Sequence, residues 1–173
     1  NGEIIIISEK GMESIRPFPK VAERPCIFER IYFSRPDSML GGNTVYTYRK
    51  NLGIELAKEH YVDADTVVPV PDSGVPAALG YAQQSNTPFE LGIIRNHYVG
   101  RTFIEPSQSI RQFGVKLKHN ANVSYIKNKK IILIDDSIVR GTTAKKIIKM
   151  IYDAGAKEVH LGIACPPIKH PDF

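Results

Sequence analysis

Residues 131–143 read Ile-Ile-Leu-Ile-Asp-Asp-Ser-Ile-Val-Arg-Gly-Thr-Thr, and they carry the strongest structural signal in the chain. The first four are branched and apolar, which is typical of a strand buried on both faces of a sheet. Two carboxylates end this strand, a short loop over 137–141 follows, and apolar residues then recur at helical spacing from Ala144. This order predicts an α/β domain, in which ligands bind at the carboxyl ends of the strands.

The loop and the acidic pair suit different parts of one ligand. Free N–H groups at a helix N-terminus bind phosphate, and Ser137, Thr142 and Thr143 can add hydroxyl donors. Carboxylates repel phosphate, so Asp135 and Asp136 should face a vicinal diol or a magnesium ion attached to the ligand. The stretch therefore predicts a ribose-5-phosphate site. The plain alternative is a strand-to-helix turn with Asp136 or Ser137 as the helix N-cap.

The rest of the chain alternates in a similar way. A Pro-rich linker is expected over 17–25, and an apolar stripe of the helix over 45–60 is expected from Val45, Tyr48, Leu52 and Leu56. Strands separated by helices predict a mainly parallel sheet. The expected strands cover 3–7, 26–33, 65–70, 89–94, 131–134 and 158–164, and the other helices begin at 75 and 144.

A second candidate ligand loop is the turn Pro71-Asp72-Ser73-Gly74, at the carboxyl end of the strand over 65–70. It should share the sheet edge with the acidic pair. Successive N–H groups in such a turn can form an anion-binding nest, and Gly74 permits either a close backbone approach or a positive φ. A type I turn with no ligand is the alternative.

Residues 95–117 show little apolar periodicity, and a stretch of this length inside a compact domain is usually a functional loop. Its apolar members need something to close over, and its cations suit a pyrophosphate leaving group. A solvated basic loop is the alternative. The cations of this region are Arg95, Arg101, Arg111, Lys116 and Lys118.

Composition narrows the class of protein. The 173 residues are 42% hydrophobic, enough for one domain with a real core. A formal charge of +5 suits a polyanionic ligand but is too small to require nucleic acid. No apolar run approaches the ~20 residues of a membrane span. Cys26 and Cys165 are too few for a disulfide framework or a thiolate metal cage, so two reduced thiols in a cytoplasmic protein are expected.

The stretch 135–143 resembles the phosphoribosyl pyrophosphate (PRPP) signature of type I phosphoribosyltransferases, and its wording is most similar to the amidophosphoribosyltransferases. The resemblance covers nearly all of 25–173, expected to be a phosphoribosyltransferase domain truncated at its C-terminal end. Residues 1–24 are expected to hold the tail of a preceding glutaminase domain and a linker. Similar segments also occur at 26–29, 33–38, 49–53 and 98–104.

The resemblance implies a type I phosphoribosyltransferase-like α/β fold with a mainly parallel sheet flanked by helices. The implied reaction displaces pyrophosphate from C1 of PRPP by ammonia, as the first step of de novo purine biosynthesis. Magnesium would lie near Ser73, Asp135 and Asp136, and Tyr98, Arg101 and Lys118 would be catalytic. The implied PRPP-binding residues are Asp72, Ser73, Gly74, Asp135, Asp136, Ser137, Val139, Arg140, Gly141, Thr142 and Thr143.

Two departures from the family pattern matter. The amino-terminal cysteine nucleophile of the glutaminase is missing, so glutamine hydrolysis requires a domain outside this chain. Cys26 matches one ligand of the iron–sulfur cluster that some members carry, but Asp172 stands where a second ligand is expected, so no cluster is expected. The resemblance also implies a homo-oligomer with purine nucleotide feedback inhibitors, and neither a nucleic acid nor a membrane partner.

Two other functions stay open. One is a salvage phosphoribosyltransferase that uses a purine or pyrimidine base, although the sequence of residues 98–104 argues against it. The other is a regulatory PRPP-binding protein. RNA binding by such a protein would be supported by a basic face with interleaved aromatic residues, and the lysines at 127, 129 and 130 lack them.

Overall fold

The computed structural model describes residues 2–22, 26–96, 119–167 and 169. Its centre is a parallel sheet in the order β5-β8-β9, formed by β5 (Thr66–Pro69), β8 (Lys130–Asp135) and β9 (Glu158–Ile163). Val67 lies opposite Ile132, which in turn lies opposite His160. The central strand is therefore the acid-terminated one, and the predicted α/β class is confirmed.

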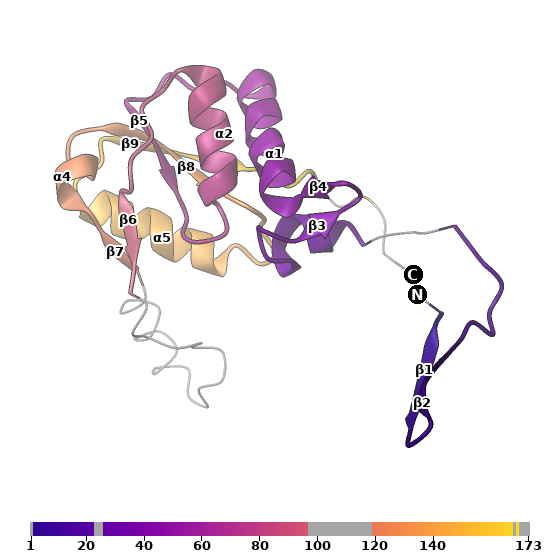
Figure 1. Ribbon diagram of the computed structural model, residues 1–173. Coiled ribbons are helices and arrows are strands. Elements are labelled where there is room, and N and C mark those ends of the chain that lie inside the picture. Colours follow the sequence, from indigo (N-terminus) through magenta and orange to yellow (C-terminus); the bar gives the residue numbers. More distant parts are fainter. Residues whose placement is uncertain (1, 23–25, 97–118, 168, 170–173) are drawn as a thin grey trace.

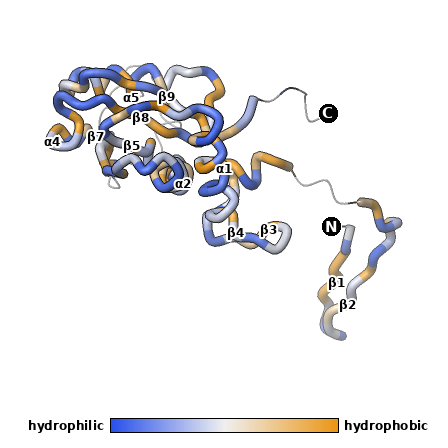
Figure 2. Tube along the Cα trace, turned by 90° about the horizontal axis from the view of Figure 1, so that it is seen from above, coloured by the Kyte–Doolittle hydropathy of each residue, from blue (hydrophilic) through white to orange (hydrophobic). Residues whose placement is uncertain are grey.

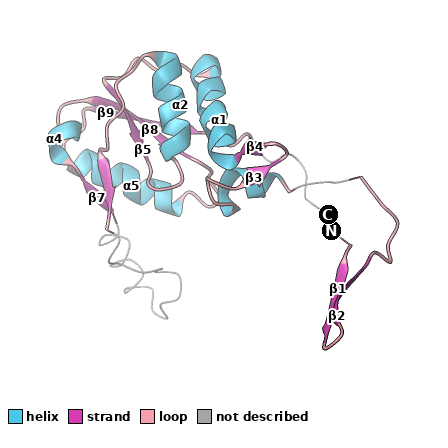
Figure 3. Cartoon of the chain, viewed as in Figure 1, coloured by secondary structure: helices cyan, strands magenta, loops and turns pink. Residues whose placement is uncertain are grey.

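β8 is buried on both faces, as its four apolar residues predict. Ile132 and Ile134 point to one side and Ile131 and Leu133 to the other, because side chains alternate along a strand. The first pair packs against α1 (Val45–Glu59) and α2 (Val75–Ser85), and the second against α5 (Thr142–Asp153), so the helices cover both faces (Figures 1 and 3).

α1 and α2 pack with their backbones nearly in contact. A Cβ atom on Gly53 would lie 1.8 Å from the carbonyl oxygen of Ala77, and one on Gly80 would lie 1.9 Å from that of Lys50. The expected stripe is only partly confirmed: Val45 is buried and Leu56 packs against the core, but Tyr48, Leu52 and Leu56 are only half-buried. The smallest side chain selects the contact face, and the buried residues of α1 are Val45, Arg49, Gly53 and Ala57.

Two expected strands differ from the structure. Residues 29–33 form a helical turn, η1 (Glu29–Phe33), in which only Ile31 is buried, and no strand of the described residues pairs with it. The strand expected over 89–94 is divided. Phe89 forms a single bridge to β5, whereas β6 (Ile93–Arg95) turns away to pair antiparallel with β7 (His119–Ala121).

The smaller elements complete the chain. A short hairpin, β3 (Met39–Leu40) and β4 (Asn43–Thr44), precedes α1, and one helical turn, α4 (Val123–Ile126), precedes β8. Within the described ranges, no helix is both long and apolar enough to span a membrane.

The strand expected over 3–7 is confirmed as β1 (Ile4–Ser8), which forms an antiparallel hairpin with β2 (Gly11–Ile15). Every residue of both strands is exposed, including four consecutive isoleucines. Figure 2 shows the hairpin set apart from the main body of the chain, with β1 coloured as hydrophobic. A two-stranded hairpin is marginally stable on its own in water, so its apolar faces need a partner surface.

Tyr81 provides a test of the packing. Its side chain is fully buried, and its hydroxyl accepts a hydrogen bond from Val62 N–H and donates one to His60 O, each at 3.0 Å. We expect Tyr81→Phe to lower the free energy of unfolding by about 1–2 kcal/mol, because both backbone partners lose their hydrogen bond. Urea titration measures this, with exposed Tyr61→Phe as the matched control. Equal stability of both variants would contradict it.

Candidate active site

The acidic pair continues the ladder between β8 and β9. Asp135 is the last residue of β8, and its carbonyl oxygen accepts a hydrogen bond from Ala164 N–H at 3.0 Å. The carbonyl oxygen of Asp136 accepts one from Cys165 N–H at 2.9 Å. Both carboxylates are therefore anchored at the carboxyl end of the central strand, where the sequence predicted a ligand site.

The two carboxylates are under-compensated. Burial, followed by the negative charge of Asp136, raises the pKa of Asp135 to about 7. Asp136 is only 6% exposed, and its Oδ1 accepts a hydrogen bond from the Ser137 hydroxyl. Its Oδ2 is buried and has no hydrogen-bond partner among the described residues. Buried polar atoms are rarely left without partners, so this pair is suited to ligand hydroxyls or a cation.

The loop after the pair leaves the start of α5 open. Gly141 is the N-cap with φ 69°, and no described side chain caps the helix, so the alternative in which Asp136 or Ser137 is the cap is wrong. Val139 is 83% exposed, and Arg140, Thr142 and Thr143 are also exposed. The N–H groups of the first helical turn and these hydroxyls can therefore bind an anion.

The turn over 71–74 lies against the end of β8. Val70 N–H donates to Ile134 O at 2.8 Å, and a Cβ atom on Gly74 would lie 2.5 Å from the same oxygen. Gly74 has φ −75°, so its role is close approach and not positive φ. The peptide bond between Pro71 and Asp72 is cis. The structure thus brings the turn, the acidic pair and the loop after it to one sheet edge, as predicted.

Arg95 belongs to this edge as well. The sequence placed it in the long loop, but it is the last residue of β6 and is held by pairing with β7. Its guanidinium forms an ion pair with the Asp72 carboxylate. The other predicted catalytic side chains, Tyr98, Arg101 and Lys118, lie outside the described residues.

Sequence reasoning missed Arg49. Its guanidinium is 4% exposed and donates to Arg30 O at 3.0 Å and to Ser34 O at 2.9 Å. Burial lowers the pKa of Arg49, and the negative charge of Asp136 opposes that shift. An Arg at i+4 between Val45 and Gly53 was the available signal, because that spacing places it in the buried stripe. Cys26 and Cys165 are both free thiols, as expected.

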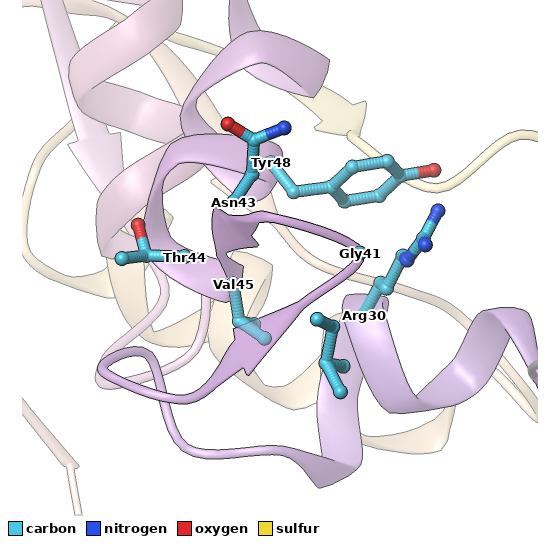
Figure 4. Close-up of a pocket in the computed structure, with 7 residues that line it drawn as sticks. Arg30, Gly41, Asn43, Thr44, Val45 and Tyr48 are labelled. Carbon is cyan, nitrogen blue, oxygen red and sulfur yellow. The ribbon is translucent and has the colours of Figure 1, made fainter.

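A small cavity of about 70 Å³ lies elsewhere, between η1, the β3–β4 hairpin and the start of α1 (Figure 4). The Arg30 guanidinium lies over the Tyr48 ring, 5.5 Å from its centroid. None of the residues that line this cavity is an acidic, turn or loop residue of the candidate site.

The fold and this edge define a phosphoribosyltransferase domain. The family model for the phosphoribosyl transferase domain matches residues 47–171, and the chain belongs to that family. Within the family it is similar to amidophosphoribosyltransferases. It is 63% identical to the amidophosphoribosyltransferase of Rhizobium etli, covering 100% of this chain and 36% of that protein.

Two solved structures are similar to this chain and support the same family. A structure described as that of the allosteric regulatory enzyme of purine biosynthesis superposes with a TM-score of 0.83 at 50% identity, over 98% of this chain and 37% of that one. The glutamine PRPP amidotransferase of Bacillus subtilis, complexed with ADP and GMP, gives a TM-score of 0.83 at 50% identity over 99% and 38%. The chain therefore spans about a third of the length of these relatives.

The pKa of Asp135 generates a prediction about stability. Because it is raised from 3.8 to about 7, the folded protein binds more protons than the unfolded chain between these values. The contribution of Asp135 to stability should be complete below about pH 4 and be lost, by up to a few kcal/mol, as the pH rises from about 4 to about 7. We expect Asp135→Asn to flatten this slope, measured by thermal unfolding in chelator. Exposed Asp153→Asn is the control and should keep the wild-type slope. An unchanged slope in Asp135→Asn would contradict the assignment.

Proposed function

We propose that this chain is the phosphoribosyltransferase part of an amidophosphoribosyltransferase. It would transfer ammonia to C1 of PRPP and release 5-phosphoribosylamine and pyrophosphate, as the first step of de novo purine biosynthesis. The single observation that carries the proposal is the junction at one sheet edge between the acidic pair of β8, the uncapped start of α5 and the turn over 71–74. PRPP has a diol, a phosphate and a pyrophosphate that need three such neighbouring subsites.

Two groups of residues in this chain would bind the two ends of the ribose-5-phosphate. The carboxylates of Asp135 and Asp136 accept hydrogen bonds from the two ribose hydroxyls, and the unpartnered Oδ2 of Asp136 gains a donor. The 5-phosphate lies at the start of α5, where N–H groups and the hydroxyls of Thr142 and Thr143 donate to it. Anchoring both ends of the sugar orients C1 toward the incoming nitrogen, which is the entropic part of catalysis.

The turn over 71–74 would hold the leaving pyrophosphate. As the bond from C1 to pyrophosphate breaks, positive charge builds on the ribose ring and negative charge on the leaving group. Donors that face the leaving group stabilise that charge, and no covalent nucleophile is required. The turn offers backbone N–H groups and the Ser73 hydroxyl. The proposed roles of Tyr98, Arg101 and Lys118 are also to act on the leaving group.

Magnesium fits the donor set of this edge. The orphan Oδ2 of Asp136 and the pKa of Asp135, which burial and the charge of Asp136 raise, both indicate negative charge that is not fully compensated. In the described part of the chain no three His, Cys, Asp or Glu side chains gather as a metal cage. Magnesium is commonly bound by one or two carboxylates together with substrate phosphates, so Asp135, Asp136 and Ser73 would hold an ion that arrives with PRPP. When bound, it would offset the charge of the leaving group.

The source of ammonia would be a glutaminase domain outside these 173 residues. The exposed apolar hairpin β1–β2 is suited to pack against that domain, so residues 1–24 would be its tail and a linker, and 25–173 the transferase domain. We also propose regulation by purine nucleotides, since a structural relative is complexed with ADP and GMP. A homo-oligomer in the cytoplasm is the further expectation. The absence of an iron–sulfur cluster remains a prediction.

A pyrophosphate-release assay tests the proposal that this chain uses ammonia and that glutamine hydrolysis requires another domain. The purified chain should release pyrophosphate from PRPP with ammonium and magnesium, and glutamine should not replace ammonium. Free purine and pyrimidine bases in place of ammonium test the salvage function. Activity with a base alone, or no release with any acceptor, would overturn the proposal.

Binding tests the acidic pair separately from turnover. We expect Asp135→Asn with Asp136→Asn to weaken PRPP binding at least about tenfold, because each lost carboxylate removes a charge-assisted hydrogen bond. Calorimetric titration in magnesium buffer measures the affinity, and circular dichroism checks the fold. The control is Asp153→Asn, which removes an exposed carboxylate that pairs with Lys149 at 2.9 Å. Equal affinities in the acidic-pair variant and the control would remove the diol assignment.

A further inference from the structure

The ion pair between Arg95 and Asp72 joins two separate parts of the fold. Asp72 lies in the turn after β5 in the parallel sheet, whereas Arg95 ends β6 in the antiparallel β6–β7 ribbon. The Arg95 side chain is 32% exposed and that of Asp72 is 55% exposed. The pair is therefore reachable from solvent, and a ligand that enters the turn would meet both charges.

Both partners retain hydrogen-bonding capacity toward an anion. The Nε of Arg95 is buried and lacks an acceptor among the described residues. In the turn, the N–H groups of Gly74 and Val75 donate to Val70 O and Asp72 O, but no described residue accepts from the N–H groups of Asp72 and Ser73. Unused donors on the guanidinium and on the turn are thus brought together by the contact that holds Arg95 there.

The Asp72 carboxylate is negative, although the turn that carries it is proposed to bind a negative pyrophosphate. A free carboxylate in this turn would repel a pyrophosphate, whereas one bound to a guanidinium is neutralised. An exposed carboxylate is also a weak partner, since such pairs contribute little free energy. A pyrophosphate carries more charge and more acceptor oxygens, so it should compete well for the same guanidinium.

We infer that Asp72 is an internal counter-ion that holds Arg95 beside the turn over 71–74 until a pyrophosphate group displaces it, and that Arg95 then binds that pyrophosphate. This inference rests on the proposed function, because it takes the turn to be the pyrophosphate subsite. It assigns Asp72 a role through its backbone N–H and its competition for Arg95, and no direct contact between its carboxylate and the ligand. Arg95 becomes a binding residue supplied by a strand and positioned before the ligand arrives.

The two halves of the pair should therefore have opposite effects on affinity. Arg95→Met removes the cation and leaves Asp72 uncompensated, so pyrophosphate should bind at least about tenfold more weakly. Asp72→Asn removes the competitor and keeps the turn, so pyrophosphate should bind about three- to tenfold more tightly. In the double variant no carboxylate repels the pyrophosphate but no guanidinium binds it, so its affinity should lie between those of Arg95→Met and the wild type.

The experiment is calorimetric titration of the 173-residue chain with inorganic pyrophosphate in magnesium buffer, at fixed ionic strength. Asp37→Asn is the matched control, since Asp37 also pairs with an arginine, Arg35, at 2.9 Å and is exposed. It reports the effect of removing one surface carboxylate at a distance from the turn. Arg95→Lys keeps the charge and covers the case in which Arg95→Met unfolds, and thermal unfolding is recorded for each variant.

The outcomes separate the two claims. Wild-type binding, with tighter binding by Asp72→Asn than by Asp37→Asn and weaker binding by Arg95→Met, supports the inference. Wild-type binding with weaker or unchanged affinity in Asp72→Asn overturns it and makes the ion pair a structural strut, while the proposed function stands. No pyrophosphate binding by the wild type or by any variant overturns both.

Discussion

The parallel pairing of β5 with β8 is the constraint on which the candidate site depends. Pro69 lies opposite Ile134, so both strands end at the same level, and Val70 N–H continues the ladder to Ile134 O at 2.8 Å. The turn after β5 then passes so close to that oxygen that only glycine fits at position 74. The distance between the turn and the acidic pair is therefore determined by backbone contact, which is far less adjustable than side-chain packing.

Buried groups with incomplete pairing gather at this same edge. Asp136 Oδ2 and Arg95 Nε are buried without a hydrogen-bond partner among the described residues, and Asp135 has a pKa raised to about 7. The two unpartnered atoms lower the stability of the folded protein, because each has lost its hydrogen bonds to water without gaining a partner in the protein. A ligand with hydroxyls, a bound cation and anionic oxygens would supply the missing partners. Their concentration at the ends of β8 and β6 is what an enzyme site built in advance of its ligand requires.

Helix packing supports the edge from behind. Gly53 and Gly80 let α1 and α2 approach closely, and Arg49 is buried on the same stripe of α1 as Gly53. Arg49 in turn binds two carbonyl oxygens of the η1 region, so it joins that segment to the helix layer. Its positive charge interacts with the carboxylate of Asp136, so Arg49 partly offsets the negative charge of the acidic pair. A side chain far from the motif in sequence thereby takes part in the electrostatics of the site.

The central strand, the helices around it and the two loops at the carboxyl end of the sheet could be predicted from the sequence. These follow from local signals: a run of branched apolar residues for the strand, apolar residues at helical spacing for the helices, and glycine where the backbone must turn. The resemblance of 135–143 to a known signature was enough to indicate the family, because the order of residue types in that stretch is specific. Other features depend on how the elements pack together. The strand expected over 26–33 is helical, β6 leaves the main sheet, and the buried face of α1 runs through Arg49 and Gly53. Partner choice for Arg95 and Asp72 was likewise invisible, because these residues are 23 positions apart and meet only after two sheets are packed. Such contacts depend on which surfaces come together in three dimensions, and a local pattern of residues carries no information about that.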